Sequence, residues 1–162
     1  MDASAIALDT VPSDLVASVH EAFLSCFSSY FGPICPCGED KVNGAGLEGI
    51  ISVISFVGTF PWTLVLALPQ STAEAMVEKF AGFEIPFDSE DMIDAVGELI
   101  NIVAGVASGH AESYGIISRM SLPSVARGSL HMRLPSDAPR HRLHYETAQG
   151  PFRVKVVTAP PR

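Results

Sequence analysis

The chain has 162 residues, which fits one folded domain over residues 1–162 and can bury a core without disulfide staples. Hydrophobic residues make up 48% of it and charged residues only 17%, so an intrinsically disordered chain is excluded. The formal net charge of −8 disfavours a general nucleic-acid binder, because such a protein needs a basic surface.

The first predicted element is a long helix near the N-terminus. Ser13 or Asp14 could cap it, directly after Pro12, and Gly32-Pro33 would end it after about Tyr30. The segment before this helix has no basic region and only a short apolar run, so we do not expect a signal peptide.

The cysteines lie in this helix and in the glycine-rich loop that follows it. Their odd number, at Cys26, Cys35 and Cys37, argues against a complete disulfide framework. Cys35-Pro36-Cys37 is one residue short of a CxxC motif and has no histidine nearby, which favours loop thiols over a zinc site. Three later histidines, at positions 131, 141 and 144, are better explained as surface residues of strands than as a metal cluster.

The uncharged stretch Ile50–Leu68 has the length of a membrane span, but its pattern favours two strands. Gly58-Thr59-Phe60-Pro61 interrupts it, and β-branched and aromatic residues dominate on both sides. We therefore predict strands at about Ile50–Val57 and Trp62–Leu68, no membrane span, and a cytoplasmic protein.

Two helices of different length are predicted next. The short one would be capped by Ser71 or Thr72 and stopped by Gly82. The long one would begin after Asp88 or Ser89, with acidic residues at its positive end, and continue to about Tyr114.

The last part of the chain contains runs with β character, separated by prolines and glycines. An antiparallel sheet with two long helices and a short one packed on it, an α+β fold, accounts for this order. Each half opens with a long helix and continues into strands, which hints at an internal duplication. The four runs are Ile116–Val125, Ser129–Leu134, His141–Thr147 and Phe152–Thr158.

The long helix has one narrow polar face in an otherwise apolar surface. At about 100° per residue, Glu98 and Asn101 both lie within about 40° of Asp94. Small residues complete this face, and glycine within a helix costs about 1 kcal/mol relative to alanine, so they favour a surface that another backbone approaches closely. The face has no lysine or arginine to pair with its acids, which indicates a partner with a basic group. The small residues are Gly97, Gly105 and Ser108.

Glu98 and Asn101 are neighbours on this face, since they are three residues apart. Neither is a convincing nucleophile. A carboxamide can accept and donate hydrogen bonds without changing charge, so Asn101 could hold a water in line with a phosphorus atom. Glu98 could hold a lysine of the partner or act as a base.

The stretch "DAVGELINIVAG", with Asp94, Glu98, Asn101 and then Pro123, resembles the signature of the CheC/CheX/FliY family. In that signature an Asp or Ser is followed by Glu, Asn and a later Pro, and here the last gap is one residue shorter. The flanking "GIISVISFVGTFPWTLVLALP" and "LPSVARGS" resemble the CheX arrangement, so the resemblance covers about residues 10–158.

The resemblance implies a phosphatase that acts on a phosphorylated CheY-type response regulator. Asn101 would then position the attacking water, Glu98 would pair with a receiver lysine, and Asp94 would contribute to partner binding. The magnesium ion would belong to the receiver, so this chain would need no cofactor and no metal site of its own.

The first helix does not repeat the signature, because Leu24 stands where Glu21 would require an Asn. One site for each chain resembles CheX, and this resemblance implies a homodimer. Two other interpretations stay open: a module that binds a receiver without turnover, and a structural oligomerisation domain. Glu98→Lys would disrupt the dimer only in the last of these.

Overall fold

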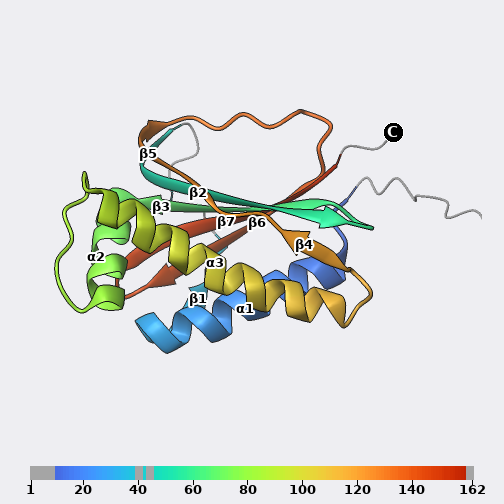
Figure 1. Ribbon diagram of the computed structural model, residues 1–162, viewed down its shortest axis with the longest axis horizontal. Coiled ribbons are helices and arrows are strands. Elements are labelled where there is room, and N and C mark those ends of the chain that lie inside the picture. Colours follow the sequence, from blue (N-terminus) through green and yellow to red (C-terminus); the bar gives the residue numbers. More distant parts are fainter. Residues whose placement is uncertain (1–9, 39–41, 43–45, 160–162) are drawn as a thin grey trace, which may run out of the picture.

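A seven-stranded antiparallel sheet forms the centre of the molecule, with its strands in the order β1-β6-β7-β3-β2-β4 and with β5 also paired to β2. The computed structural model describes residues 10–38, 42 and 46–159 (Figure 1). The helices are α1 (Ser13–Phe31), α2 (Gln70–Ala81) and α3 (Glu90–Glu112). The strands are β1 (Cys35–Pro36), β2 (Leu47–Gly58), β3 (Trp62–Pro69), β4 (Ser118–Met120), β5 (Ser124–Leu130), β6 (Arg140–Thr147) and β7 (Gly150–Thr158).

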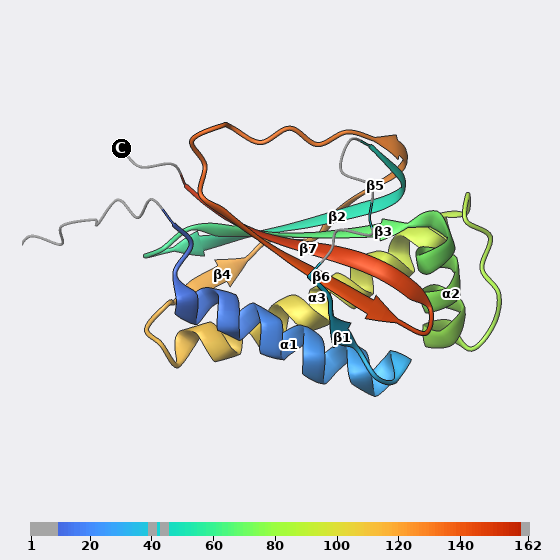
Figure 2. The same cartoon turned by 180° about the vertical axis from the view of Figure 1, so that it is seen from behind.

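The long helices α1 and α3 lie side by side against one face of the sheet, and α2 stands at one end of it (Figures 1 and 2). The strands turn alternate side chains toward these helices, as a pleated sheet requires. Phe27 of α1, for example, packs against Phe152 of β7 with 5.1 Å between ring centroids. The predicted α+β fold, with helices on an antiparallel sheet, is therefore confirmed.

The opposite face of the sheet carries a second, smaller apolar cluster, and the segment between β5 and β6 arches over this face (Figure 1). The cluster joins residues from β2 and β3 with one residue of the preceding loop. Its buried members are Val42, Leu47, Ile51, Val65 and Ala67.

The predicted helix caps are correct only for α3. Pro12 and Pro69 precede α1 and α2 without any side-chain cap, so the expected caps at Ser13 or Asp14 and at Ser71 or Thr72 are wrong. Helix α2 starts directly at the end of β3, and the Thr72 hydroxyl instead donates to the Pro151 carbonyl at 2.9 Å. A tertiary hydrogen bond here replaces the local cap.

The predicted strands are confirmed in outline and corrected in detail. The run Ile116–Val125 is not one strand, because β4 ends at Met120 and β5 begins at Ser124. Strand β5 ends at Leu130, so the expected strand to Leu134 is also wrong beyond that residue. The loop thiol Cys35 lies on the short strand β1, which was not predicted.

Within the described residues, one helix is long and apolar enough by composition to cross a membrane, namely α3. This is weak evidence, because a helix that packs on a protein core meets the same criterion. Five large apolar residues of α3 lie in the core beneath it, since Met92, Val96, Leu99, Ile100 and Val103 are all buried. The stretch Ile50–Leu68 forms strands β2 and β3, as predicted.

Candidate functional site

The start of α3 is fixed by local and tertiary hydrogen bonds. The Met92 backbone N–H donates to the Ser89 hydroxyl oxygen at 3.2 Å, which confirms Ser89 as the cap. From β5, the Arg127 guanidinium donates to the carbonyls of Phe87 and Ser89 at 2.9 and 2.6 Å. The sheet therefore sets the position of the helix on which the predicted site residues stand.

A groove of about 320 Å³ runs between α3 and the segment that joins β4 to β5. Four of the six predicted site residues line its helical side: Asp94, Gly97, Glu98 and Asn101. Asp94 and Glu98 are exposed, and Asn101 is partly exposed. The structure thus brings two carboxylates, one carboxamide and a glycine of this helix face to one open depression.

The opposite side of the groove is formed by a break in the sheet edge. Ser121 exchanges two hydrogen bonds with Ser55 of β2: its N–H donates to the Ser55 carbonyl at 2.8 Å, and its hydroxyl accepts the Ser55 N–H at 3.1 Å. Leu122 then turns outward and is 85% exposed, while Pro123 and Val125 face α3. The proline of the sequence signature therefore lies directly across the groove from the helix.

Gly97 forms the floor of this groove. A Cβ atom built on it would lie 3.6 Å from Pro123 Cγ and from Val125 Cγ2, which is ordinary van der Waals contact. Glycine is therefore not required here for packing within the chain. Its effect is to leave the groove one methyl group deeper.

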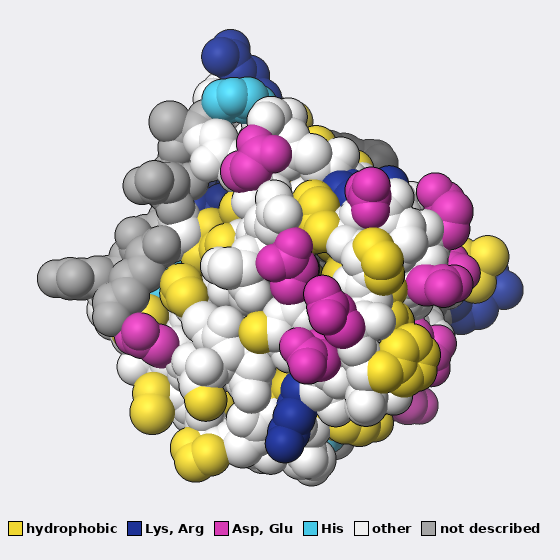
Figure 3. All heavy atoms as spheres, turned by 90° about the vertical axis from the view of Figure 1, so that its left-hand side faces the viewer, with side chains coloured by type: hydrophobic (Ala, Val, Ile, Leu, Met, Phe, Trp, Pro, Cys, Tyr) yellow, Lys and Arg dark blue, Asp and Glu magenta, His cyan; other side chains and the backbone are white. Residues whose placement is uncertain are grey.

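The groove is acidic, and no lysine, arginine or histidine among the described residues lines it. Further acids gather at the end of the molecule where α2 meets the start of α3 (Figure 3). A basic group on a partner would therefore meet complementary charge on this side. The exposed acids at this end are Glu74, Glu78, Glu84, Asp88, Glu90 and Asp91.

Two predicted residues, Gly105 and Ser108, lie further along α3 and do not line the groove. Gly105 is exposed, and an added Cβ would meet nothing within 4 Å, so this part of the helix is also open to a neighbour. Three lining residues were not predicted: Ile93, Leu122 and Val125. Of these three, only Leu122 could have been predicted from the sequence, as a large apolar residue next to the proline of the signature.

The corresponding face of α1 does not present a second pair of this kind. Ser18 is buried, and its hydroxyl donates to the Asp14 carbonyl at 2.7 Å. Glu21 Oε2 lies 3.7 Å from Nδ1 of the half-buried His110 on α3, an ion pair only when the imidazole is protonated. No group of three or more His, Cys, Asp or Glu side chains in the described part of the chain is placed to hold a metal ion.

The sheet, its long helix and the open groove with Glu98 and Asn101 together define an α+β protein with a candidate docking site on one helix. Residues 50–146 match the family model described as "Chemotaxis phosphatase CheX", and the chain belongs to this family. No curated protein matches the chain in sequence.

Solved structures share the fold at low sequence identity. A chemotaxis protein CheX from Desulfovibrio desulfuricans matches with a TM-score of 0.76 and 23% identity, over 90% of this chain and 99% of that one. A CheX–CheY–BeF3–Mg²⁺ complex from Borrelia burgdorferi matches with a TM-score of 0.73 and 15% identity, over 90% and 98%.

The FliM middle domain from H. pylori matches with a TM-score of 0.61 and 13% identity, over 93% of this chain and 94% of that one. The predicted CheC/CheX-like architecture is therefore confirmed. Because a CheX protein and the FliM middle domain share this fold, the fold alone does not specify an activity, which depends on the residues of the groove.

Proposed function

We propose that this protein is a phosphatase that hydrolyses the aspartyl phosphate of a CheY-type response regulator. The observation that carries the proposal is the groove itself, in which Glu98 and Asn101 of a CheX-family helix are both accessible to a partner. The complex of a structurally similar CheX with CheY, BeF3 and Mg²⁺ supports a receiver as that partner.

In the proposed reaction a water attacks the phosphorus atom, the bond from phosphorus to the aspartyl oxygen breaks, and inorganic phosphate leaves the receiver carboxylate. Phosphoryl transfer depends chiefly on positioning and on neutralisation of charge. The Asn101 carboxamide would hold the water in line, because it accepts one hydrogen bond from the water while its NH₂ group stays available. The magnesium ion of the receiver would neutralise the phosphoryl oxygens, and this chain would supply no metal ligand.

Glu98 would dock a lysine of the receiver, and Asp94 would add negative charge beside it. Gly97 would admit the receiver surface into the groove, and Gly105 with Ser108 would extend the contact along α3. We also propose that the protein acts in the cytoplasm and as a homodimer, in line with the CheX resemblance.

The test is to follow the decay of a phosphorylated CheY-type receiver with catalytic amounts of this protein. Asn101→Ala is expected to slow turnover at saturation by about 10²-fold, since misplacing a reacting water by about 1 Å has an effect of that size. Glu98→Gln should raise the receiver concentration needed for half-maximal rate. Glu112→Gln is the matched control, because Glu112 is an exposed acid of α3 outside the groove.

Two results would contradict the phosphatase proposal and favour one of the other two functions. Saturable receiver binding without any faster decay would favour a binding module. Loss of the dimer in Glu98→Lys, measured by analytical ultracentrifugation, would favour an oligomerisation domain; the phosphatase proposal expects the dimer to persist and the turnover to fall.

A further inference from the structure

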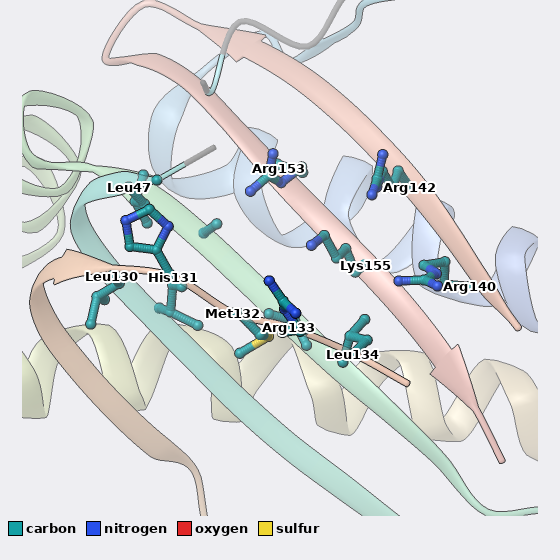
Figure 4. A pocket seen from close by; sticks show the side chains of 14 residues that line it. Leu47, Leu130, His131, Met132, Arg133, Leu134, Arg140, Arg142, Arg153 and Lys155 are labelled. Atoms are coloured by element: carbon teal, nitrogen blue, oxygen red, sulfur yellow. The ribbon is translucent and has the colours of Figure 1, made fainter. Parts of the chain in front are cut away.

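A second cavity lies on the face of the sheet opposite α1 and α3. It has a volume of about 310 Å³ and is bounded by β2, β3, β6 and β7 and by the segment that follows β5. Figure 4 shows Arg153 and Lys155 on β7 and Arg140 and Arg142 on β6, with Arg133 approaching them from the segment after β5. This cavity shares no residue with the groove on α3.

The cavity concentrates the positive charge of an acidic protein. Five of the ten lysines and arginines of the chain line it, although the net charge is −8. His131 adds a sixth nitrogen-bearing side chain, and none of the described lining residues is an aspartate or a glutamate. A cavity lined by this much positive charge attracts anions.

The strand register places like charges directly opposite each other, which destabilises an antiparallel pair. Arg142 of β6 lies opposite Lys155 of β7. A bound anion between the two strands would relieve this repulsion.

Two of the arginines are held in place by backbone carbonyls. Arg153 is buried, and its guanidinium donates to the Val42 carbonyl at 3.2 Å. Arg140 donates to the carbonyls of Pro135 and Ser136 at 3.3 and 3.4 Å, which fastens the segment above the sheet. Arg133 and Arg142, in contrast, are exposed and have no hydrogen bond or ion pair to another described residue, so their guanidinium groups can turn to a ligand.

The floor of the cavity is apolar, because Leu47, Ile51, Val65 and Ala67 of the small outer cluster line it. A ligand that fits both parts carries phosphate at one end and a flat or apolar group at the other. A second copy of this chain is a poorer occupant, since a symmetric contact would place the arginines against themselves. The volume lies at the lower end of the range for small-molecule pockets.

We propose that this cavity binds a small phosphorylated anion of the nucleotide class. Arg133 and Arg142 would hold the phosphate, because a planar guanidinium donates two parallel hydrogen bonds to it. Arg153 and Lys155 would add positive charge from β7. The sugar and base would lie over the apolar floor.

The experiment is calorimetric titration of the full chain at low salt with ADP, inorganic pyrophosphate, adenosine and a glutamate-rich peptide. ADP should bind saturably with a dissociation constant below about 100 µM, a modest affinity for a small ligand. Pyrophosphate should bind more weakly, and adenosine should not bind at the concentrations used. Amide NMR shifts on adding ADP should appear in 130–134 and in β6 and β7.

Arg133→Ala and Arg142→Ala should each weaken ADP binding by about tenfold, the usual effect of losing a charge-assisted hydrogen bond. Both side chains are exposed, so the variants should keep the far-UV circular dichroism and the receiver activity of the parent. Arg119→Ala is the matched control: it removes an exposed arginine of β4 that lies outside the cavity and should leave ADP binding unchanged.

The proposal is overturned if ADP gives no saturable binding, if the Arg142→Ala variant binds ADP as the parent does, or if adenosine binds equally well. Tighter binding of the acidic peptide than of ADP would also overturn it, because the cavity would then be a docking site for protein. None of these outcomes depends on the phosphatase activity, since Asn101→Ala should leave ADP binding intact.

Discussion

Replacing Gly97 by alanine should make the protein more stable and less able to engage its receiver. A Cβ at this position meets Pro123 and Val125 at 3.6 Å, so nothing in the chain has to move. Alanine in a helix is about 1 kcal/mol more favourable than glycine. For a domain of this length that gain corresponds to a melting temperature higher by about 2–4 °C.

The same methyl group would fill the floor of the groove. If the receiver packs closely there, one extra methyl group should cost about 1–3 kcal/mol of docking energy. That cost corresponds to a roughly 5- to 150-fold weaker receiver interaction. We therefore expect a higher receiver concentration at half-maximal rate. The turnover at saturation should change less, because Asn101 is untouched.

The assay pairs urea or thermal unfolding with phosphoreceiver decay at several receiver concentrations. Gly109→Ala is the control, since Gly109 is exposed on the same helix, has no atom within 4 Å of an added Cβ and lies outside the groove. It should gain similar stability and keep full activity. If Gly97→Ala also keeps the parent affinity for receiver, the groove is not the contact surface and the reasoning fails.

Three further substitutions test the same structure. Leu122→Ser should change the unfolding free energy by less than about 0.5 kcal/mol, because the side chain is 85% exposed. In a titration it should weaken receiver binding about tenfold. Binding equal to that of the parent would show that Leu122 is not part of the interface. Gly49→Ala should lower the unfolding free energy by at least about 1–3 kcal/mol in urea, since an added Cβ would collide with the Leu68 carbonyl oxygen; an unchanged urea midpoint would contradict this. Burial raises the pKa of Tyr145 above its ordinary value of about 10. The unfolded chain therefore loses the phenol proton first, and the free energy of unfolding should fall as pH rises above about 10, by up to about 1.4 kcal/mol per pH unit. Tyr145→Phe should lose this alkaline slope, together with the 2.7 Å hydrogen bond to His20 Nδ1, and a slope that persists in the variant would refute the assignment.

The polar face of α3 could be predicted from sequence because helical periodicity is a local property. Residues three and four apart share a face whatever the rest of the chain does. Once Met92, Val96 and Val103 are buried, the face with Glu98 and Asn101 must turn away from the core. The segment opposite that face is determined by tertiary packing, and only the proline of the signature indicated it in the sequence.

The cationic cavity shows what local patterns cannot predict. The sequence shows that Arg140 and Arg142 are two residues apart at the start of one predicted strand, and Arg153 and Lys155 two residues apart on another. Their convergence depends on the pairing of β6 with β7 and on the exit of the chain from the sheet after Leu130. The β character of the run Ser129–Leu134 predicted a strand there, but the chain instead leaves the sheet after Leu130 and brings Arg133 over its outer face.

The groove depends on one extra residue at the edge of the sheet. Between the pairs Phe56↔Met120 and Val53↔Ser124, the edge strands advance four positions while β2 advances three. Such a bulge changes which side chains face each side of the sheet.

As a result, Val125 and Arg127 lie opposite the inward-facing residues Ser52 and Ile50, on the side of α3. Without the extra residue, Ala126 and Gly128 would face α3, Arg127 would point to the outer face, and the carbonyls at the start of α3 would lose their donor. The bulge that ends β4 at Met120 therefore builds the wall of the groove and also holds the helix opposite to it. Sequence periodicity could not reveal this, because the run from Ile116 to Val125 is apolar enough to be read as one continuous strand.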